Sequence, residues 1–252
     1  MAKQVGPLQI NGTIGNLTFY KSQDGFMVKS KSAISADKIA KSASFQRTRE
    51  NMAEFSNAGK SASLLRKAFV NLITRAKDRR LTSRLTSTMY KALQADDISE
   101  RGQRNVTQGE PSLLAGLDFN IKASMASTLI APYTTTIDRA TGDVTITIPA
   151  FVPANLVKAP QGATHFQLFM GAALVDFEAV TYESLTAASE SLELNNTATA
   201  AISLKATLPA NSTLPLFVAF GIEFLQQVNG KMYSLNNGEY NACSIIKVDI
   251  TA

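Results

Sequence analysis

The spacing of apolar residues changes twice along this 252-residue chain, and each change marks a different kind of secondary structure. Residues 13–20 and 26–29 are rich in β-branched and aromatic side chains, and between them stands Asp24-Gly25, a strong turn signal. This pattern predicts an N-terminal β-hairpin. Gly12 and Gly15 lie at its first strand, where they indicate a bulge or a place at which another backbone comes close.

From residue 44 the apolar residues recur every three, four or seven positions, which is the spacing of one face of a helix. This stripe predicts a helix over residues 44–73 and consists of Phe45, Met52, Phe55, Gly59, Ala62, Leu65 and Phe69. Small residues near its middle, Ala58 to Ser63, would let a second helix approach closely, although Gly59 costs about 1 kcal/mol of helix propensity relative to Ala.

A second helix is expected to start with Asp78 as its N-cap and to end near Asp96. Its apolar stripe contains Leu81, Leu85 and Met89. Because only about five residues join the two helices, we expect them to pack antiparallel.

After Pro111 the sequence pattern predicts short strands separated by Gly, Pro and Asn, which is typical of an antiparallel sandwich or barrel. Asn229-Gly230 predicts a two-residue hairpin turn. The strands are expected at residues 134–138, 144–148, 165–170, 201–208, 216–226, 231–235 and 244–250.

The predicted fold class is therefore α+β, with three regions along the chain. We expect a β-hairpin over residues 1–34, a basic helical region with an antiparallel helix pair over residues 35–110, and an immunoglobulin-like β-sandwich over residues 111–252.

The two halves of the chain carry opposite net charges. Residues 1–125 carry 20 basic and 10 acidic side chains, whereas residues 126–252 carry 5 and 10, so the two parts have net charges of +10 and −5. Residues 29–104, with 17 basic and 7 acidic side chains, account for the whole excess of the first part. Such a chain could bind a polyanion at one end, or could meet the opposite surface of another copy.

Two candidate interaction surfaces follow from these patterns. The first is basic and consists of Arg47, Arg49, Arg66, Lys67, Arg75, Lys77, Arg79, Arg80 and Arg84. It could neutralise phosphates with strongly salt-dependent affinity, or its guanidinium groups could pair with acids of the same fold or of a neighbouring copy. The second is a hairpin that could add to another sheet, with Gly12, Gly15, Phe19 and Tyr20 as its candidate residues.

Residues that usually carry out catalysis are scarce. His165 and Cys243 are the single histidine and cysteine, so a zinc site with three or four such ligands and an intrachain disulfide are both excluded. We expect His165 on a strand and Cys243 as a small core residue. Asp176 and Glu178 could serve a glycosidase, but acids in an acidic domain usually form a solvated face. No nucleophile elbow or phosphate-binding loop is present, and we expect no enzymatic activity, metal, cofactor or small-molecule substrate.

No apolar stretch is long enough to cross a bilayer, because residues 214–225 are interrupted by Pro215, Gly221 and Glu223. Residues 1–15 lack the unbroken apolar region of a signal peptide. We therefore expect a cytoplasmic protein by default, one that could end up in an exported or released particle.

Several motifs resemble a family of uncharacterised proteins common in Bacteroidota. The resemblance covers nearly the whole chain and implies a bacterial source and one recurring architecture, but no site residues. The motifs are residues 12–21 (GTIGNLTFYK), 47–55, 58–60, 99–105, 159–165, 223–230 and 233–238.

Three functions remain open from the sequence. The leading hypothesis is a structural protein that self-associates into a filament, ring or shell through its basic helical and acidic β surfaces. The first alternative is nucleic-acid binding by residues 29–104, although neither a helix-turn-helix nor an RNA-binding signature is found. The second is recognition of carbohydrate or protein by the β region, for which the candidate residues are Tyr133, Tyr182, Tyr233 and Tyr240.

Overall fold

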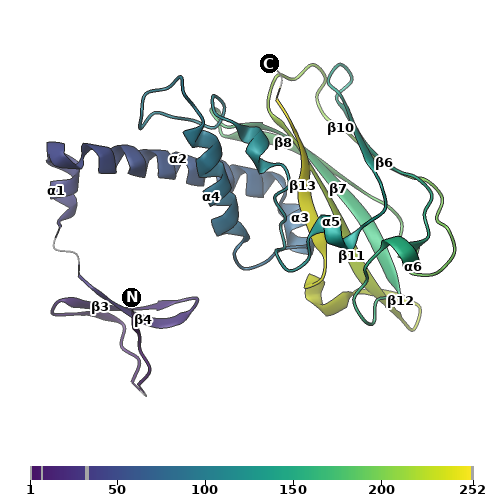
Figure 1. Ribbon diagram of the computed structural model, residues 1–252, viewed down its shortest axis with the longest axis horizontal. Coiled ribbons are helices and arrows are strands. Elements are labelled where there is room, and N and C mark those ends of the chain that lie inside the picture. The colour runs from purple at the N-terminus through teal and green to yellow at the C-terminus, as the bar shows by residue number, and fades with distance from the viewer. Residues whose placement is uncertain (1, 7, 32–33, 251–252) are drawn as a thin grey trace. The chain divides into compact units, whose positions relative to one another are not determined.

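The computed structural model describes residues 2–6, 8–31 and 34–250, and the fold is of the mixed α+β class, as predicted (Figure 1). The chain divides into two compact units, Met1–Asn51 and Met52–Ala252, which we call the N-terminal unit and the C-terminal unit. The division falls inside a helix, so the helical region expected at residues 35–110 is shared between the two units.

The N-terminal unit contains a four-stranded antiparallel sheet rather than a lone hairpin. In spatial order its strands are β1 (Ala2–Lys3), β4 (Gly25–Ser30), β3 (Leu17–Ser22) and β2 (Gly12–Ile14). The run expected as one strand over residues 13–20 is two strands, because Gly15-Asn16 form a two-residue turn between Ile14 and Leu17. Gly15 has φ +56°, a left-handed conformation that glycine adopts without steric strain.

Three short helical elements follow this sheet and lead out of the N-terminal unit. They are α1 (Ala36–Lys41), the 3₁₀ turn η1 (Ala43–Phe45) and the beginning of α2 (Gln46–Ala68). Ser35 caps α1, since its Oγ accepts the N–H of Lys38 at 3.3 Å.

Two antiparallel sheets pack face to face in the C-terminal unit. The smaller sheet has the order β10 (Ile202–Thr207), β6 (Asp143–Ile148) and β5 (Thr134–Asp138). In the larger sheet β11 (Leu216–Val228) pairs with β7 (His165–Asp176). The other side of β11 pairs with β13 (Ala242–Asp249) and β12 (Lys231–Ser234), and the other side of β7 pairs with β8 (Thr181–Ala188) and β9 (Leu192–Glu193).

All seven strands expected after Pro111 are present, and Asn229-Gly230 forms the predicted turn with φ values of 50° and 76°. Strands β8 and β9 were not predicted. The side chains of β8 are exposed or half-exposed on both faces of the sheet, so its sequence lacks the alternation that reveals a half-buried strand.

Alternate residues of the central strands face two different cores. Phe166, Leu168 and Met170 of β7 point into the core between the two sheets, whereas Phe169 and Ala173 point into a core under the helices. The helices therefore cover one face of the larger sheet and the smaller sheet covers the other (Figure 1).

The helices differ from the expected antiparallel pair. Phe69 separates α2 from α3 (Val70–Arg75), and α4 (Leu81–Gln94) follows after a turn. Figure 1 shows α4 crossing α2 steeply instead of running beside it. The predicted geometry is wrong because α3 redirects the chain between the two longer helices.

The apolar stripe of α2 is buried only in its second half. Ala58, Ala62 and Leu65 are buried, but Met52 and Phe55 are each 58% exposed. A Cβ added at Gly59 would have no neighbour within 4 Å, so Gly59 does not permit the expected close approach of a second helix.

Close approach occurs instead at Gly171 of β7, where an added Cβ would stand 2.9 Å from both terminal carbons of Leu72. A glycine on the sheet thus lets α3 lie directly on β7.

Short elements complete the C-terminal unit, namely η2 (Pro111–Leu114), α5 (Met125–Thr128), α6 (Pro153–Leu156) and η3 (Leu235–Gly238). Among the residues that the structure describes, no helix combines the length and the apolar character needed to span a membrane.

Candidate interaction surfaces

Arg84, a member of the expected basic surface, is bound within its own unit. Its Nη2 lies 2.5 Å from Oδ2 of Asp78, and its Nη1 donates to the carbonyl of Asp118 at 2.6 Å. Asp78 also accepts the N–H groups of Arg80 at 2.6 Å and Ile121 at 2.8 Å. Burial would raise the pKa of Asp78, but these hydrogen bonds and the charge of Arg84 outweigh it and lower the pKa. The N-cap of α4 is Arg80, so Asp78 does not have the expected capping role.

Arg75 is also held inside the C-terminal unit. Its guanidinium lies 5.2 Å from the ring centre of Phe169, and Nη1 is 3.6 Å from Oε2 of Glu223 and 3.3 Å from Oε1 of Gln167. Arg75 therefore joins α3 to two neighbouring strands of the larger sheet.

Two further arginines of the expected surface have acceptors in their own unit. Arg66 donates to Oγ1 of Thr82 at 3.0 Å. Arg49 donates to the carbonyls of Ile39 and Ser42, each at 2.8 Å, and so satisfies the carboxyl end of α1. These arginines stabilise local structure.

The rest of the expected basic surface is exposed. Arg47 forms a surface pair with Glu50 at 2.9 Å, and Lys67 is exposed on α2. Lys77, Arg79 and Arg80 are exposed and adjacent in the turn between α3 and α4, and we call these three residues the basic turn.

One face of the N-terminal sheet is mainly apolar. The register places Ile14, Leu17, Phe19, Phe26 and Val28 on the same side, since paired residues of an antiparallel sheet share a face. Lys21 lies on this face too, with its Nζ 5.6 Å from the ring centre of Phe26. Ile14 is 60% exposed and Leu17 is 44% exposed, and none of the described residues of the N-terminal unit is buried. The unit therefore supplies no second layer to cover this face.

The other residues expected to support strand addition occupy different places on the sheet. Gly12 lies in β2, whose three residues are all exposed, and Gly15 lies in the turn that follows. Tyr20 is on the opposite face from Phe19, with Nζ of Lys29 5.5 Å from its ring centre.

The two units differ in charge. The N-terminal unit has eight basic and three acidic side chains, a net charge of +5, whereas the C-terminal unit has 17 of each. Residues 159–204, which include β7, β8 and β9, contain five acidic side chains and neither Lys nor Arg. The acids are Asp176, Glu178, Glu183, Glu190 and Glu193.

Strand β8 forms an edge of the larger sheet with unpaired backbone groups. Ser189 N donates to Leu168 O at 2.8 Å, so these two residues form a hydrogen-bonded pair. Hydrogen-bonded and non-hydrogen-bonded pairs alternate along an antiparallel ladder, so every second residue of β8 counted back from Ser189 bonds to β7. The residues between them, which include Tyr182, Ser184 and Thr186, direct their N–H and C=O groups away from β7. No hydrogen bond formed among the described residues involves these outward groups.

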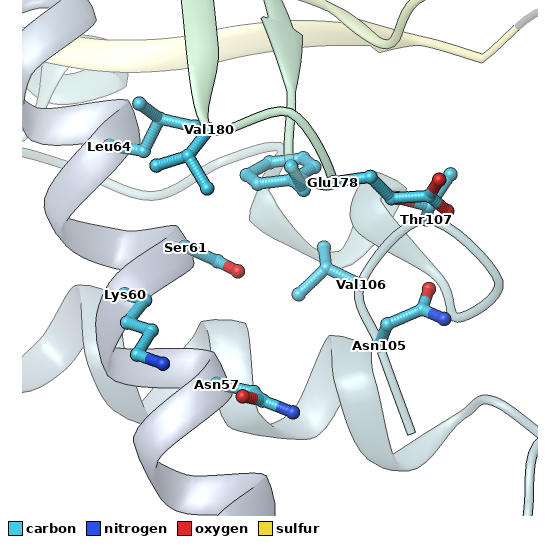
Figure 2. A pocket seen from close by; sticks show the side chains of 10 residues that line it. Asn57, Lys60, Ser61, Leu64, Asn105, Val106, Thr107, Glu178 and Val180 are labelled. Carbon is cyan, nitrogen blue, oxygen red and sulfur yellow. The ribbon is translucent and has the colours of Figure 1, made fainter. Parts of the chain in front are cut away.

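A hollow of about 200 Å³ lies at the end of β8, between α2, residues 105–107 and the turn from β7 to β8 (Figure 2). Leu64, Val106 and Val180 form its apolar part, and Lys60 lies toward the other end. Its volume is below the roughly 300–1,000 Å³ of small-molecule sites, so it suits one or two side chains better than a cofactor.

Val180 at this hollow has φ +58°, a left-handed conformation that is unfavourable for a β-branched residue. The side chain is also 58% exposed. The turn between β7 and β8 is thus strained and presents an apolar side chain to solvent.

Buried polar groups in the C-terminal unit hold loops in place. Asp96 accepts the N–H groups of Ile98, Ser99 and Asn105, and although burial would raise its pKa, these bonds lower the pKa to about 2. Glu54 accepts the N–H of Gly102 at 2.8 Å.

The single histidine and cysteine lie on strands, as predicted. His165 is 8% exposed, with Nδ1 2.9 Å from Oγ1 of Thr164. Cys243 is fully buried in β13, and burial together with the charge of Asp118 raises the pKa of its thiol. Over the described part of the chain, no three His, Cys, Asp or Glu side chains converge on a possible metal site.

The four tyrosines expected as recognition residues are dispersed. Tyr133 is half-buried with its ring 5.0 Å from that of Phe220, and burial raises its pKa. Tyr182 and Tyr233 are exposed on β8 and β12, and Tyr240 is exposed before β13.

Comparison with protein-family models, with curated proteins and with solved structures finds no match to this chain. Strand addition by the N-terminal hairpin stays a prediction. The sequence analysis did not predict β8, although residues 159–204, which contain neither Lys nor Arg, already marked this part of the chain as acidic.

Proposed function

We propose that this chain is a non-enzymatic structural protein that self-associates head to tail into a filament, ring or shell. One surface of the contact is the N-terminal unit, and the other is the acidic part of the C-terminal unit formed by β7, β8 and β9. A contact between two different surfaces of one chain repeats from copy to copy until a ring closes or a filament grows.

The observation that carries this proposal is the N-terminal sheet. Its apolar face includes Ile14 and Leu17, which are 60% and 44% exposed, and the unit has no buried residue among those described. A sheet whose apolar face stays in water does not gain the hydrophobic stabilisation that covering this face would give. Burial against another surface would stabilise it by roughly 25 cal/mol for each Å² of apolar area removed from water.

Charge selects the partner surface. The N-terminal unit has a net charge of +5, and residues 159–204 carry five acidic and no basic side chains. Basic helices and acidic strands also meet within the C-terminal unit, as at Arg75 and Glu223. The basic and acidic side chains of that unit are equal in number, so its net charge is zero. The charge left uncompensated is that of the N-terminal unit.

Multi-angle light scattering of the full chain at low and high salt tests the proposal. We expect species heavier than the 27.1 kDa chain at 50 mM salt and smaller species at 1 M, where the Debye length falls to about 3 Å. A monomer at high protein concentration in both buffers would refute it.

A second candidate function is nucleic-acid binding by the basic turn. Its three cations, Lys77, Arg79 and Arg80, are exposed and adjacent, whereas Arg66, Arg75 and Arg84 have acceptors within the C-terminal unit. Gel retardation tests this candidate. Generic DNA and RNA are mixed with the full chain or with the variant in which all three residues of the basic turn are changed, Lys77→Glu, Arg79→Glu and Arg80→Glu. If the full chain retards neither DNA nor RNA at low salt, nucleic-acid binding is ruled out.

The immunoglobulin-like arrangement of residues 111–252 and membership of the Bacteroidota family stay predictions. Recognition of carbohydrate or protein by the β strands also stays a prediction, for which exposed Tyr182, Tyr233 and Tyr240 are the available aromatic groups.

A further inference from the structure

We infer that the free edge of β8 is the surface that receives the partner, and that it accepts strand β2 from the N-terminal unit of a second copy of this chain. The inference rests on the self-association proposed above and specifies which strands meet. Main-chain hydrogen bonds would join the two sheets, and opposite charges would set the pairing.

Strand β8 lacks the features by which edge strands usually avoid pairing. It has eight residues, contains neither Lys nor Pro, and pairs with β7 without a bulge from Ala188 to Thr181. Strand β12, at the opposite edge of the same sheet, has only four residues and begins with Lys231. Of these two strands, β8 is therefore the better template for an added strand.

The backbone groups needed for addition are available on β8. The N–H and C=O groups of Tyr182, Ser184 and Thr186 point away from β7 and have no acceptor or donor among the described residues. Tyr182 and Leu185 are 40% and 46% exposed, so an added strand would also remove apolar surface from water.

Charge complementarity identifies the occupant as another copy of the chain. Glu183 lies in β8, Asp176 and Glu178 lie at its turn, and residues 159–204 contain no basic side chain. The N-terminal unit carries the net charge of +5 that such an edge attracts. A neutral or acidic partner would lack this attraction.

Strand β2 is suited to act as the donor. It is the outermost strand of the N-terminal sheet, and Gly12, Thr13 and Ile14 are all exposed. A Cβ at Gly12 would meet no atom within 4 Å, so the space beside this residue is open.

Two variants of the full chain block the two sides of this contact separately. Thr186→Pro removes an outward N–H of β8 without removing a hydrogen bond to β7, and Thr186→Val is its matched control because it keeps the N–H. Ile14→Glu places an acid on β2 opposite an acidic edge, and Ile14→Val is its control because it keeps an apolar side chain there and adds no charge.

Sedimentation velocity at low salt compares each variant alone with an equimolar mixture of Thr186→Pro and Ile14→Glu. We expect each blocked variant to lose all species heavier than a monomer, and each control to assemble. The mixture should form a one-to-one dimer, because one chain still has a free β8 and the other a functional β2. Far-UV circular dichroism verifies folding, and Glu183→Lys replaces Thr186→Pro if the proline variant unfolds.

Each other outcome has a distinct meaning. Assembly of Thr186→Pro at the wild-type level would overturn the assignment of β8 and leave the proposed self-association standing. Folded variants that stay monomeric in the mixture would overturn the pairing of β2 with β8. A monomeric wild-type chain would refute self-association itself.

Discussion

Asp78 provides the sharpest test of which charged residues stabilise the fold and which are free to bind a partner. Asp78→Ala removes the acceptor of three donors, the N–H groups of Arg80 and Ile121 and the guanidinium of Arg84. The side chains of Asp78 and Arg84 are 9% and 24% exposed, so the pair is largely shielded from water. Removing one partner of a buried pair costs roughly 3–5 kcal/mol, and partial exposure places this pair at the lower end, about 3 kcal/mol.

The Lys122–Glu239 pair provides the contrast. Nζ and Oε1 are 2.6 Å apart, but the side chains are 64% and 50% exposed. Water and salt screen such a pair, so Glu239→Ala should cause little or no loss of stability.

Urea unfolding followed by far-UV circular dichroism measures both variants, since the chain contains no tryptophan. We expect a clear fall in the midpoint for Asp78→Ala and a wild-type midpoint for Glu239→Ala. Equal midpoints for the two variants would show that burial does not separate these pairs. Arg84→Ala should lose stability as Asp78→Ala does, while folded Arg84→Ala keeps its wild-type association because Arg84 faces its own chain.

Three further predictions concern the C-terminal unit. The pKa of Asp96 is about 2 in the fold and 3.8 as a free side chain. The stability that the ionised carboxylate adds is therefore complete above about pH 4 and is lost as the pH falls toward 2, so the urea midpoints of wild type and Asp96→Ala should converge over that range. Gly171→Ala should destabilise the fold by about 1–2 kcal/mol, because the new methyl group meets Leu72, whereas Gly59→Ala should stabilise the fold by roughly 0.5–1 kcal/mol. Thermal midpoints of the two variants that shift in the same direction would contradict this. Val180→Gly removes a strained φ of +58° and should raise the thermal midpoint, and a lower midpoint would show that Val180 is not strained.

The parts of the fold that follow from local pattern were predictable from the sequence. Strand β6 alternates apolar and polar residues, β5 is rich in β-branched side chains, and Asn229-Gly230 supplies the conformation that a two-residue hairpin requires. Strand β11 is buried on both faces over most of its length, and its continuous apolar run also predicted it.

The errors in the helices have one physical origin. Phe69 continues the apolar stripe of α2, so no local signal indicates that the helix ends at Ala68. The break follows from packing on the sheet, where α3 lies against Gly171. Met52 and Phe55 fit the same stripe, yet they stay exposed because burial depends on what covers a face and not on the spacing of its residues.

The candidate surface was predictable in composition but not in arrangement. The sequence showed an excess of basic residues without showing that Arg49, Arg66, Arg75 and Arg84 are bound inside their own units. Those contacts join segments far apart in the chain, and only the fold reveals them. The structure thereby restricts the surplus positive charge to the N-terminal unit.

Hydrogen exchange as a function of protein concentration tests the central claim most directly. We predict that at low salt the backbone amides of Thr13 in β2 and of Ser184 and Thr186 in β8 exchange more slowly as the concentration of the full chain rises. Amides inside the larger sheet, such as that of Val218 in β11, should be equally protected at every concentration. Exchange of the β2 and β8 amides that is independent of concentration would contradict assembly through these two strands.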